Sequence, residues 1–118
     1  MKLNRLSNTL RVAAPLAVAF ALVSGVSYAG GDAANGEQLA ATCAACHGAD
    51  GNSAIPANPK LAGQYESYLV YALKAYRSGA RQNAIMAGFA AALTDQEMAD
   101  LAAWFSSQES DLYVLKKN

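Results

Sequence analysis

The sequence predicts an all-α domain of about four helices joined by long loops. Two observations carry this prediction. Apolar residues recur at the three- and four-residue spacing of a helix face in three separate segments, and the alternating pattern of a strand occurs in none of them. Between these segments glycine, proline, asparagine and serine gather, which is typical of loops. With 118 residues, the chain has room for one domain.

The N-terminal residues are expected to be removed from the mature protein. Residues 1–11 carry basic side chains and no acidic one, residues 12–23 are uncharged, and Ser27-Tyr28-Ala29 fits a cleavage site. This pattern predicts a secretory signal peptide of residues 1–29, and therefore a mature domain of residues 30–118 in the periplasm. The alternative is an uncleaved membrane anchor, but Pro15 and several small polar residues interrupt the apolar run that a span requires.

The charge balance disfavours some classes of partner. The full chain has a formal net charge of zero. The charged residues lost with residues 1–29 are all basic, so the mature domain is acidic. An acidic surface argues against nucleic acid and favours a protein partner with a basic patch, because such fields mainly raise encounter rates.

The first predicted helix begins at Asp32, a suitable N-cap residue. Gly36, Leu39, Ala40 and Cys43 then share one helix face, and the helix is expected to run into the motif that begins at Cys43. Gly36 is either merely tolerated in this helix or allows a second helix to approach closely. We favour the second interpretation, because glycine within a helical pattern often marks close packing.

The most informative motif is the run from Cys43 to His47, which reads C-x-x-C-H. On a helical turn two thiols three residues apart point to nearly the same side, where both can add to the vinyl groups of one porphyrin. His47 then lies under the ring and can ligate the iron. The motif therefore predicts one covalently attached haem c.

Three other interpretations of the motif are weaker. A disulfide or a thioredoxin-like pair would explain both cysteines in an oxidising compartment, but would leave His47 without a role and lacks the neighbouring βαβ pattern. A zinc site needs further cysteine or histidine ligands, and the chain has only Cys43, Cys46 and His47. Chance occurrence is the third. A haem also suits so small a domain, which would otherwise have a marginal apolar core.

Residues 48–63 are rich in turn-forming residues and predict a loop. A carbonyl of this loop, at Pro56 or Pro59, could accept a hydrogen bond from the second ring nitrogen of His47, unless these prolines serve only as turn residues. An amphipathic helix follows and ends at Gly79. Its apolar stripe is formed by Tyr65, Tyr68, Leu69, Ala72, Leu73 and Tyr76, and we interpret the tyrosines as core residues, some of which contact the haem.

Residues 80–93 are expected to form a second linking segment, and they contain Met86. Met1 leaves with the signal peptide and Met98 falls within the last helical stripe, so Met86 is the methionine free to reach the iron from the side opposite His47. The alternative is a methionine that fills a gap in the core. With the haem motif present we favour Met86 as the second axial ligand.

The last helix opens at Thr94 with a T-x-x-E capping box. Met98, Leu101, Ala102 and Phe105 form its apolar face, while Asp95 and Asp100 are expected to face water. Trp104 is a candidate to pack against Gly36. The apolar patch of residues 112–115 is expected to fold back on the body of the domain.

Five stretches together carry a family resemblance: Gly36 with Cys43–Gly48, Asp50–Ser53, Pro59–Gln64, Asn83–Ala87 and Asp100–Phe105. They are spread over residues 36–105, most of the mature chain, which resembles the class I cytochromes c and, more narrowly, the small bacterial cytochrome c553 and cytochrome c4 group. The resemblance implies a class I cytochrome c fold around covalent haem c. It also implies His47 and Met86 as axial ligands, the Pro59 carbonyl bonded to His47, and the first and last helices crossed at Gly36 and Trp104.

One feature departs from that pattern. Cytochromes c4 have two such domains and two haems, whereas this chain has one C-x-x-C-H motif. It therefore resembles a single-haem relative, or one half of that architecture, and the interface between the two domains would be absent or made with another chain.

The function that follows is one-electron transfer in the periplasm between redox partner proteins, without catalysis. Occupied axial positions in both oxidation states would leave no site for a substrate. Three alternatives remain. An electron-transfer subunit of a larger dehydrogenase or oxidase would co-purify with it, a haem sensor or enzyme with an open sixth site would bind carbon monoxide, and a thiol–disulfide oxidoreductase would be colourless.

Overall fold

The structure is a computed structural model that describes residues 30–110. The predicted signal peptide and the apolar patch of residues 112–115 lie outside the described residues. Within residues 30–110 the chain is helical and has no strand. The helices are α1 (Ala33–Ala40), α2 (Ala44–His47), α3 (Glu66–Ser78), α4 (Ala84–Ala91) and α5 (Asp95–Ser107). The all-α prediction is confirmed.

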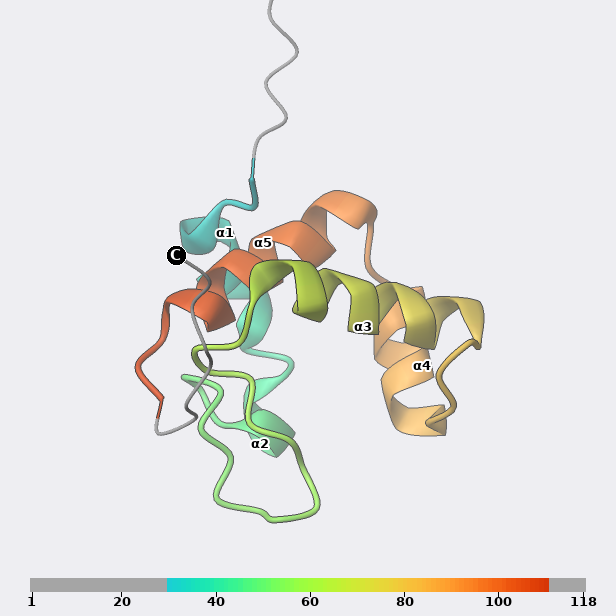
Figure 1. Cartoon of the computed structure of the whole chain (residues 1–118), viewed down its shortest axis with the longest axis horizontal. Helices are drawn as coiled ribbons and strands as arrows, with labels where there is room; N and C mark the ends of the chain where they lie inside the picture. The colour runs from blue at the N-terminus through green and yellow to red at the C-terminus, as the bar shows by residue number, and fades with distance from the viewer. Residues whose placement is uncertain (1–29, 111–118) are drawn as a thin grey trace, which may run out of the picture.

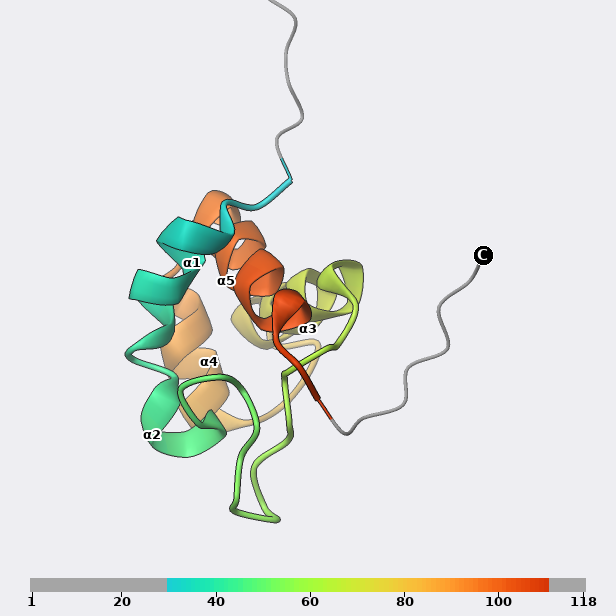
Figure 2. The same cartoon turned by 90° about the vertical axis from the view of Figure 1, so that its left-hand side faces the viewer.

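The core lies where α1 and α3 meet α5. Figure 1 and Figure 2 both show α1 crossing α5, with α3 beside α5 on another side. Leu69 of α3 and Ala40 of α1 pack with Leu101, Ala102 and Phe105 of α5 in one buried cluster. α4 lies next to the C-terminal end of α3, while α2 and the long loop of residues 48–63 lie toward the N-terminal end of α3. None of the helices in residues 30–110 has the length and apolar character needed to cross a membrane.

Three predicted helix ends are confirmed. The carboxylate of Asp32 accepts hydrogen bonds from the backbone N–H groups of Ala34 and Asn35, so it caps α1. Thr94 and Glu97 form the capping box of α5, each side chain bonding the other's backbone N–H. Gly79 ends α3 in the left-handed conformation, with φ of 78°.

Two helix boundaries differ from the prediction. α1 ends at Ala40 and does not run into the C-x-x-C-H motif. The backbone N–H groups of residues 41–43 bond to carbonyls three residues earlier, as in a 3₁₀ turn, and a new helix begins at Ala44. The prediction of a linking segment over residues 80–93 is wrong for its centre, where α4 forms. The α4 sequence, AIMAGFAA, has no polar face and so gives no amphipathic signal.

The tyrosine stripe of α3 is only partly core. Tyr65 and Tyr68 are exposed, at 42% and 45% of their surface, and the buried positions of the helix are Leu69, Ala72 and Ala75. Tyr68 and Tyr76 line a cavity beside α3 instead.

The prediction that Asp100 faces water is wrong. Its side chain is 3% exposed, and its carboxylate joins α5 to the start of α1. It accepts hydrogen bonds from the Asp32 backbone N–H at 2.8 Å, Asn35 Nδ2 at 2.6 Å and Gln96 Nε2 at 2.8 Å. Burial alone would raise the pKa of this carboxyl, but the three donors outweigh it and hold the pKa below its ordinary value.

Asp100→Asn is expected to lower the free energy of unfolding at pH 7 by about 2 kcal/mol, because an amide NH₂ would face donors that need an acceptor. The folded-state pKa of Asp100 is depressed. The stabilisation is therefore present above the unfolded pKa of about 3.9 and is lost as the pH falls through the folded value. Urea unfolding at pH 7 and pH 3 measures this.

The matched control is Asp95→Asn, because Asp95 is a solvent-exposed carboxylate of the same helix that pairs with Lys74 and Arg77. Its effect at pH 7 should be the smaller of the two. A difference between wild type and Asp100→Asn that stays constant from pH 7 to pH 3 would contradict the role assigned to the Asp100 carboxylate.

Candidate functional site

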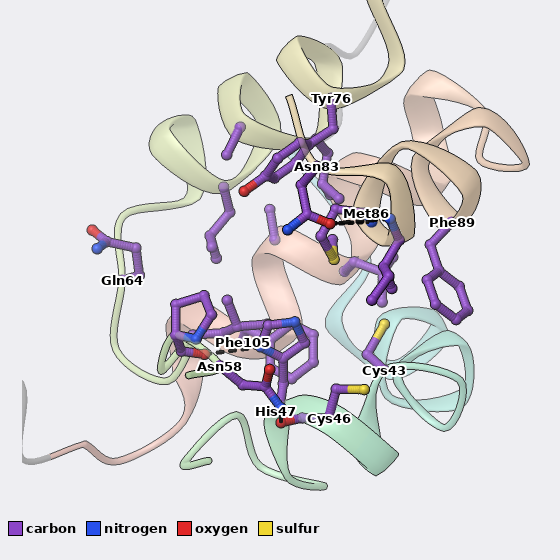
Figure 3. A pocket seen from close by; sticks show the side chains of 18 of the residues that line it. Cys43, Cys46, His47, Asn58, Gln64, Tyr76, Asn83, Met86, Phe89 and Phe105 are labelled. Carbon is purple, nitrogen blue, oxygen red and sulfur yellow. Dashed lines mark hydrogen bonds between the residues drawn. The ribbon is translucent and has the colours of Figure 1, made fainter. Parts of the chain in front are cut away.

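A cavity of about 300 Å³ opens between α2, the long loop, α3 and α4. The five site residues predicted from the sequence, Cys43, Cys46, His47, Pro59 and Met86, all line it. Figure 3 shows the ring of His47 and the sulfur of Met86 facing each other across this cavity, with the sulfurs of Cys43 and Cys46 together at one side. The remaining walls are mostly apolar and include Leu69, Ala72, Leu101 and Phe105.

The short helix α2 places the motif side chains. Cys43 immediately precedes it and Cys46 and His47 end it, so one turn brings all three to the same side. Such a short helix is held by its surroundings. The backbone carbonyl of Cys46 accepts hydrogen bonds from Ser53 Oγ at 2.9 Å and from Asn58 Nδ2 at 2.8 Å. The loop thus satisfies a helix-end carbonyl that has no partner inside the helix.

The loop of residues 48–63 is closed by its own backbone. The carbonyl of Gly51 accepts from the N–H groups of Leu61 and Ala62, at 2.8 and 3.3 Å. Gly51 has a φ of +83°, and a Cβ there would stand 2.8 Å from the Ala62 nitrogen and from Phe105 Cδ1. Only glycine fits this clamp, which seats the loop on α5.

The loop also fixes the ring of His47, which is buried. Nδ1 of His47 lies 2.8 Å from the backbone carbonyl oxygen of Pro59. A carbonyl oxygen can only accept, so Nδ1 carries the proton and donates it. In the neutral ring Nε2 then carries no proton, and it points into the cavity as a lone-pair donor for a metal.

Met86 reaches the cavity from α4. The helix starts at Asn83, whose side-chain oxygen accepts hydrogen bonds from the backbone N–H groups of Ile85 and Met86, at 3.1 and 3.0 Å. Met86 lies in the first turn of α4, opposite the ring of His47. The N-cap residue Asn83 was the sequence signal for this helix, which the missing amphipathic pattern concealed.

The two cysteines are not joined to each other, and burial raises the pKa of the Cys43 thiol. Thiol–disulfide oxidoreductases depend on the opposite shift, because their attacking thiol has a lowered pKa. This arrangement therefore disfavours thiol redox chemistry. Two separate thiols on the lining of a mostly apolar cavity are instead placed to form thioethers with one ligand.

Several cavity-lining residues were missed by the sequence interpretation. Ile85 and Phe89 of α4 line the cavity, as do Asn83 and Arg81 in the turn before it. The spacing of Ile85, Met86 and Phe89 along one side of α4 follows from the helix that the sequence interpretation did not include. No signal in the sequence alone marks Arg81.

These residues suit a haem. A flat apolar ring needs an apolar cavity, two neighbouring thiols on one side and nitrogen or sulfur donors on its two faces, and the cavity provides each. The hydrogen bond from Nδ1 of His47 to the Pro59 carbonyl, which turns Nε2 into the cavity, is the observation that points most directly to a metal ligand.

Comparison with known proteins gives one consistent result. The cytochrome c family profile matches residues 33–109. The chain is 46% identical over 96 residues to cytochrome c4 of Pseudomonas aeruginosa, which covers 81% of this chain and 48% of that protein. It is 49% identical over 82 residues to cytochrome c-554(548) of Halomonas halodenitrificans, covering 67% of this chain and 99% of that protein.

A solved structure agrees. The crystal structure of reduced recombinant cytochrome c4 from Pseudomonas stutzeri superposes with a TM-score of 0.64 at 44% identity, covering 67% of this chain and 46% of the other. The chain thus spans about half the length of the cytochrome c4 relatives that it matches.

Proposed function

The chain belongs to the cytochrome c family, and on that premise we propose that it is a periplasmic carrier of single electrons. Proteins of this family carry covalent haem c, whose iron cycles between the ferric and ferrous states. Cys43 and Cys46 would attach the haem, and His47 and Met86 would ligate its iron. The observation that carries this proposal is the pairing of His47 and Met86 across an apolar cavity, with the Pro59 carbonyl fixing the His47 tautomer.

Each of these residues has a distinct task. The Pro59 carbonyl accepts a hydrogen bond from Nδ1 of His47 and so holds the ring with Nε2 toward the cavity. The thioether of Met86 has no proton to lose, so ligation by it does not depend on pH, and it favours the ferrous state. The mostly apolar walls would limit the access of water to the iron, and with both ligands bound no position on it would remain for a substrate.

Electrons would leave and enter near the cysteine side of the cavity. Cys46 is exposed, as are Ile85 and Phe89 on the cavity rim. Redox partners make brief contacts that typically bury less than about 1,200 Å² in total. A free shuttle and a subunit of a larger dehydrogenase or oxidase would both use such a rim, and co-purification of the native protein separates them.

Export is part of the proposal, because the thioethers must form where haem and reduced thiols are brought together outside the cytoplasm. We expect a mature chain that begins at Gly30, directly after the cleavage site at Ala29. The mass of the intact mature protein measures both events, since it reports the loss of residues 1–29 and the addition of one haem.

Absorption spectra of the protein matured in a periplasm test the function directly. We expect low-spin haem c spectra in the ferric and ferrous states, with no change when carbon monoxide is added to the ferrous protein. A carbon monoxide adduct would exclude Met86 as a firm ligand and favour a sensor or enzyme. Absence of haem would overturn the proposal altogether.

A further inference from the structure

Arg81 has an unusual position for a surface cation. Its guanidinium carbon lies 4.8 Å from the ring centroid of Tyr76, and its Nη1 donates a hydrogen bond to the hydroxyl of Tyr68 at 3.4 Å. Its backbone N–H bonds the Ala75 carbonyl at the end of α3, at 3.0 Å. Arg81, Tyr68 and Tyr76 all line the cavity. The two tyrosines thus hold a permanent positive charge at its edge.

The neighbouring cations are neutralised and Arg81 is not. Lys74 and Arg77, seven and four residues earlier in the chain, both pair with Asp95, at 2.8 and 2.5 Å. In residues 30–110 no carboxylate lies within ion-pair distance of Arg81. The residues that line the cavity include Lys60 and Arg81 but no aspartate or glutamate. Arg81 therefore places a positive charge on the cavity lining, which suits an anion.

A haem c brings such an anion. It is attached through its two vinyl groups, and its two propionates project from the opposite edge of the ring. In Figure 3 the sulfurs of Cys43 and Cys46 lie on one side of the cavity, while the hydroxyl of Tyr76 points to the other. The cysteine side and the tyrosine side of the cavity thus correspond to the two ends of the haem.

From this arrangement we propose that Arg81 is the counter-cation of a haem propionate, positioned by Tyr68 and Tyr76. The inference rests on the proposed haem site and adds a determinant of the reduction potential. A guanidinium beside a propionate compensates its negative charge, and this disfavours the extra positive charge of ferric iron. Arg81 therefore raises the midpoint potential without touching the iron, as a positioning and electrostatic residue.

The experiment compares Arg81→Gln with Arg77→Gln in the mature haem-containing protein. Arg77 is the matched control, because it lies on α3, carries the same charge and does not line the cavity. Midpoint potentials are measured by spectroelectrochemistry, and resonance Raman spectra record the propionate bending band, which reports hydrogen bonding to the carboxylate. Arg81→Lys is included as the conservative variant.

We expect Arg81→Gln to shift the ferric–ferrous equilibrium toward ferric by about tenfold, or about 59 mV for one electron, and to move the propionate band. Arg81→Lys should restore most of the potential, because the charge remains. Arg77→Gln should change neither readout appreciably.

Equal potentials and equal Raman spectra for Arg81→Gln and Arg77→Gln would overturn the inference while leaving the proposed haem site intact. A potential shift in Arg81→Gln that Arg81→Lys does not reverse, with an unchanged propionate band, would also overturn it, because it would indicate a structural effect. A wild-type protein without haem would overturn both proposals.

Discussion

Replacement of Met86 by alanine is expected to open the iron to carbon monoxide and to lower the midpoint potential. In the wild-type protein the Met86 sulfur faces His47 across the cavity and would occupy the sixth position. Alanine cannot reach the iron, so ferrous Met86→Ala protein should give a carbon monoxide adduct that the wild type does not form. The potential should fall because thioether ligation favours the ferrous state.

Met98→Leu is the matched control for this variant. Met98 is fully buried in α5, belongs to the packed core and does not line the cavity. Methionine and leucine have similar volumes, so this replacement is expected to cost less than about 1.5 kcal/mol of stability and to leave the spectra and potential unchanged. If the Met86→Ala protein forms no carbon monoxide adduct and keeps the wild-type midpoint potential, the sixth ligand is another residue.

The same measurement decides between the two haem functions considered for this chain. A carrier needs both axial positions filled in each oxidation state, whereas a sensor or enzyme needs one that opens. Asn83 caps α4 and so fixes the backbone of Met86. A ligand in the first turn of a capped helix has less freedom than one in an open loop, which supports a permanently filled sixth position.

The sequence predicted those features of the fold and site that depend on local chemistry. The C-x-x-C-H run, the Asp32 cap, the capping box at Thr94 and the end of α3 at Gly79 are each decided within a few neighbouring residues, and the structure contains all four. The cavity also brings the five predicted site residues together, although they are spread from residue 43 to residue 86.

The features that the sequence did not predict depend on tertiary contacts. The sequence around Asp100 predicts a surface residue, because the donors that satisfy its carboxylate, on Asp32 and Asn35, are 68 and 65 residues away in the chain. Helix α4 lacks a polar face because one side meets the cavity and the sequence supplies no charge for the other. The position of Arg81 between two tyrosines of α3 likewise exists only once the turn after Gly79 has formed.

One tertiary contact was nevertheless predicted, because glycine within a helical pattern indicates close packing. Gly36 of α1 lies against α5, and a Cβ on it would overlap the backbone carbonyl oxygen of Asp100 and approach Trp104 Cβ to 2.9 Å. Gly36→Ala is therefore expected to force the two helices apart and to lower the free energy of unfolding by about 3 kcal/mol or more.

Chemical denaturation of the mature haem protein, followed by far-ultraviolet circular dichroism, measures this effect, and Gly88→Ala is its control. Gly88 lies in α4, has a negative φ, and has no atom within 4 Å of the position of an added Cβ. The same substitution should there raise stability by about 0.5–1 kcal/mol, since alanine favours a helix. Opposite signs for the two variants would establish that the backbone of α5, and not helix propensity, requires glycine at position 36. Equal effects would mean that α1 and α5 can move apart without loss of stability. The close packing at Gly36 would then not be what keeps Asp100 buried against α1.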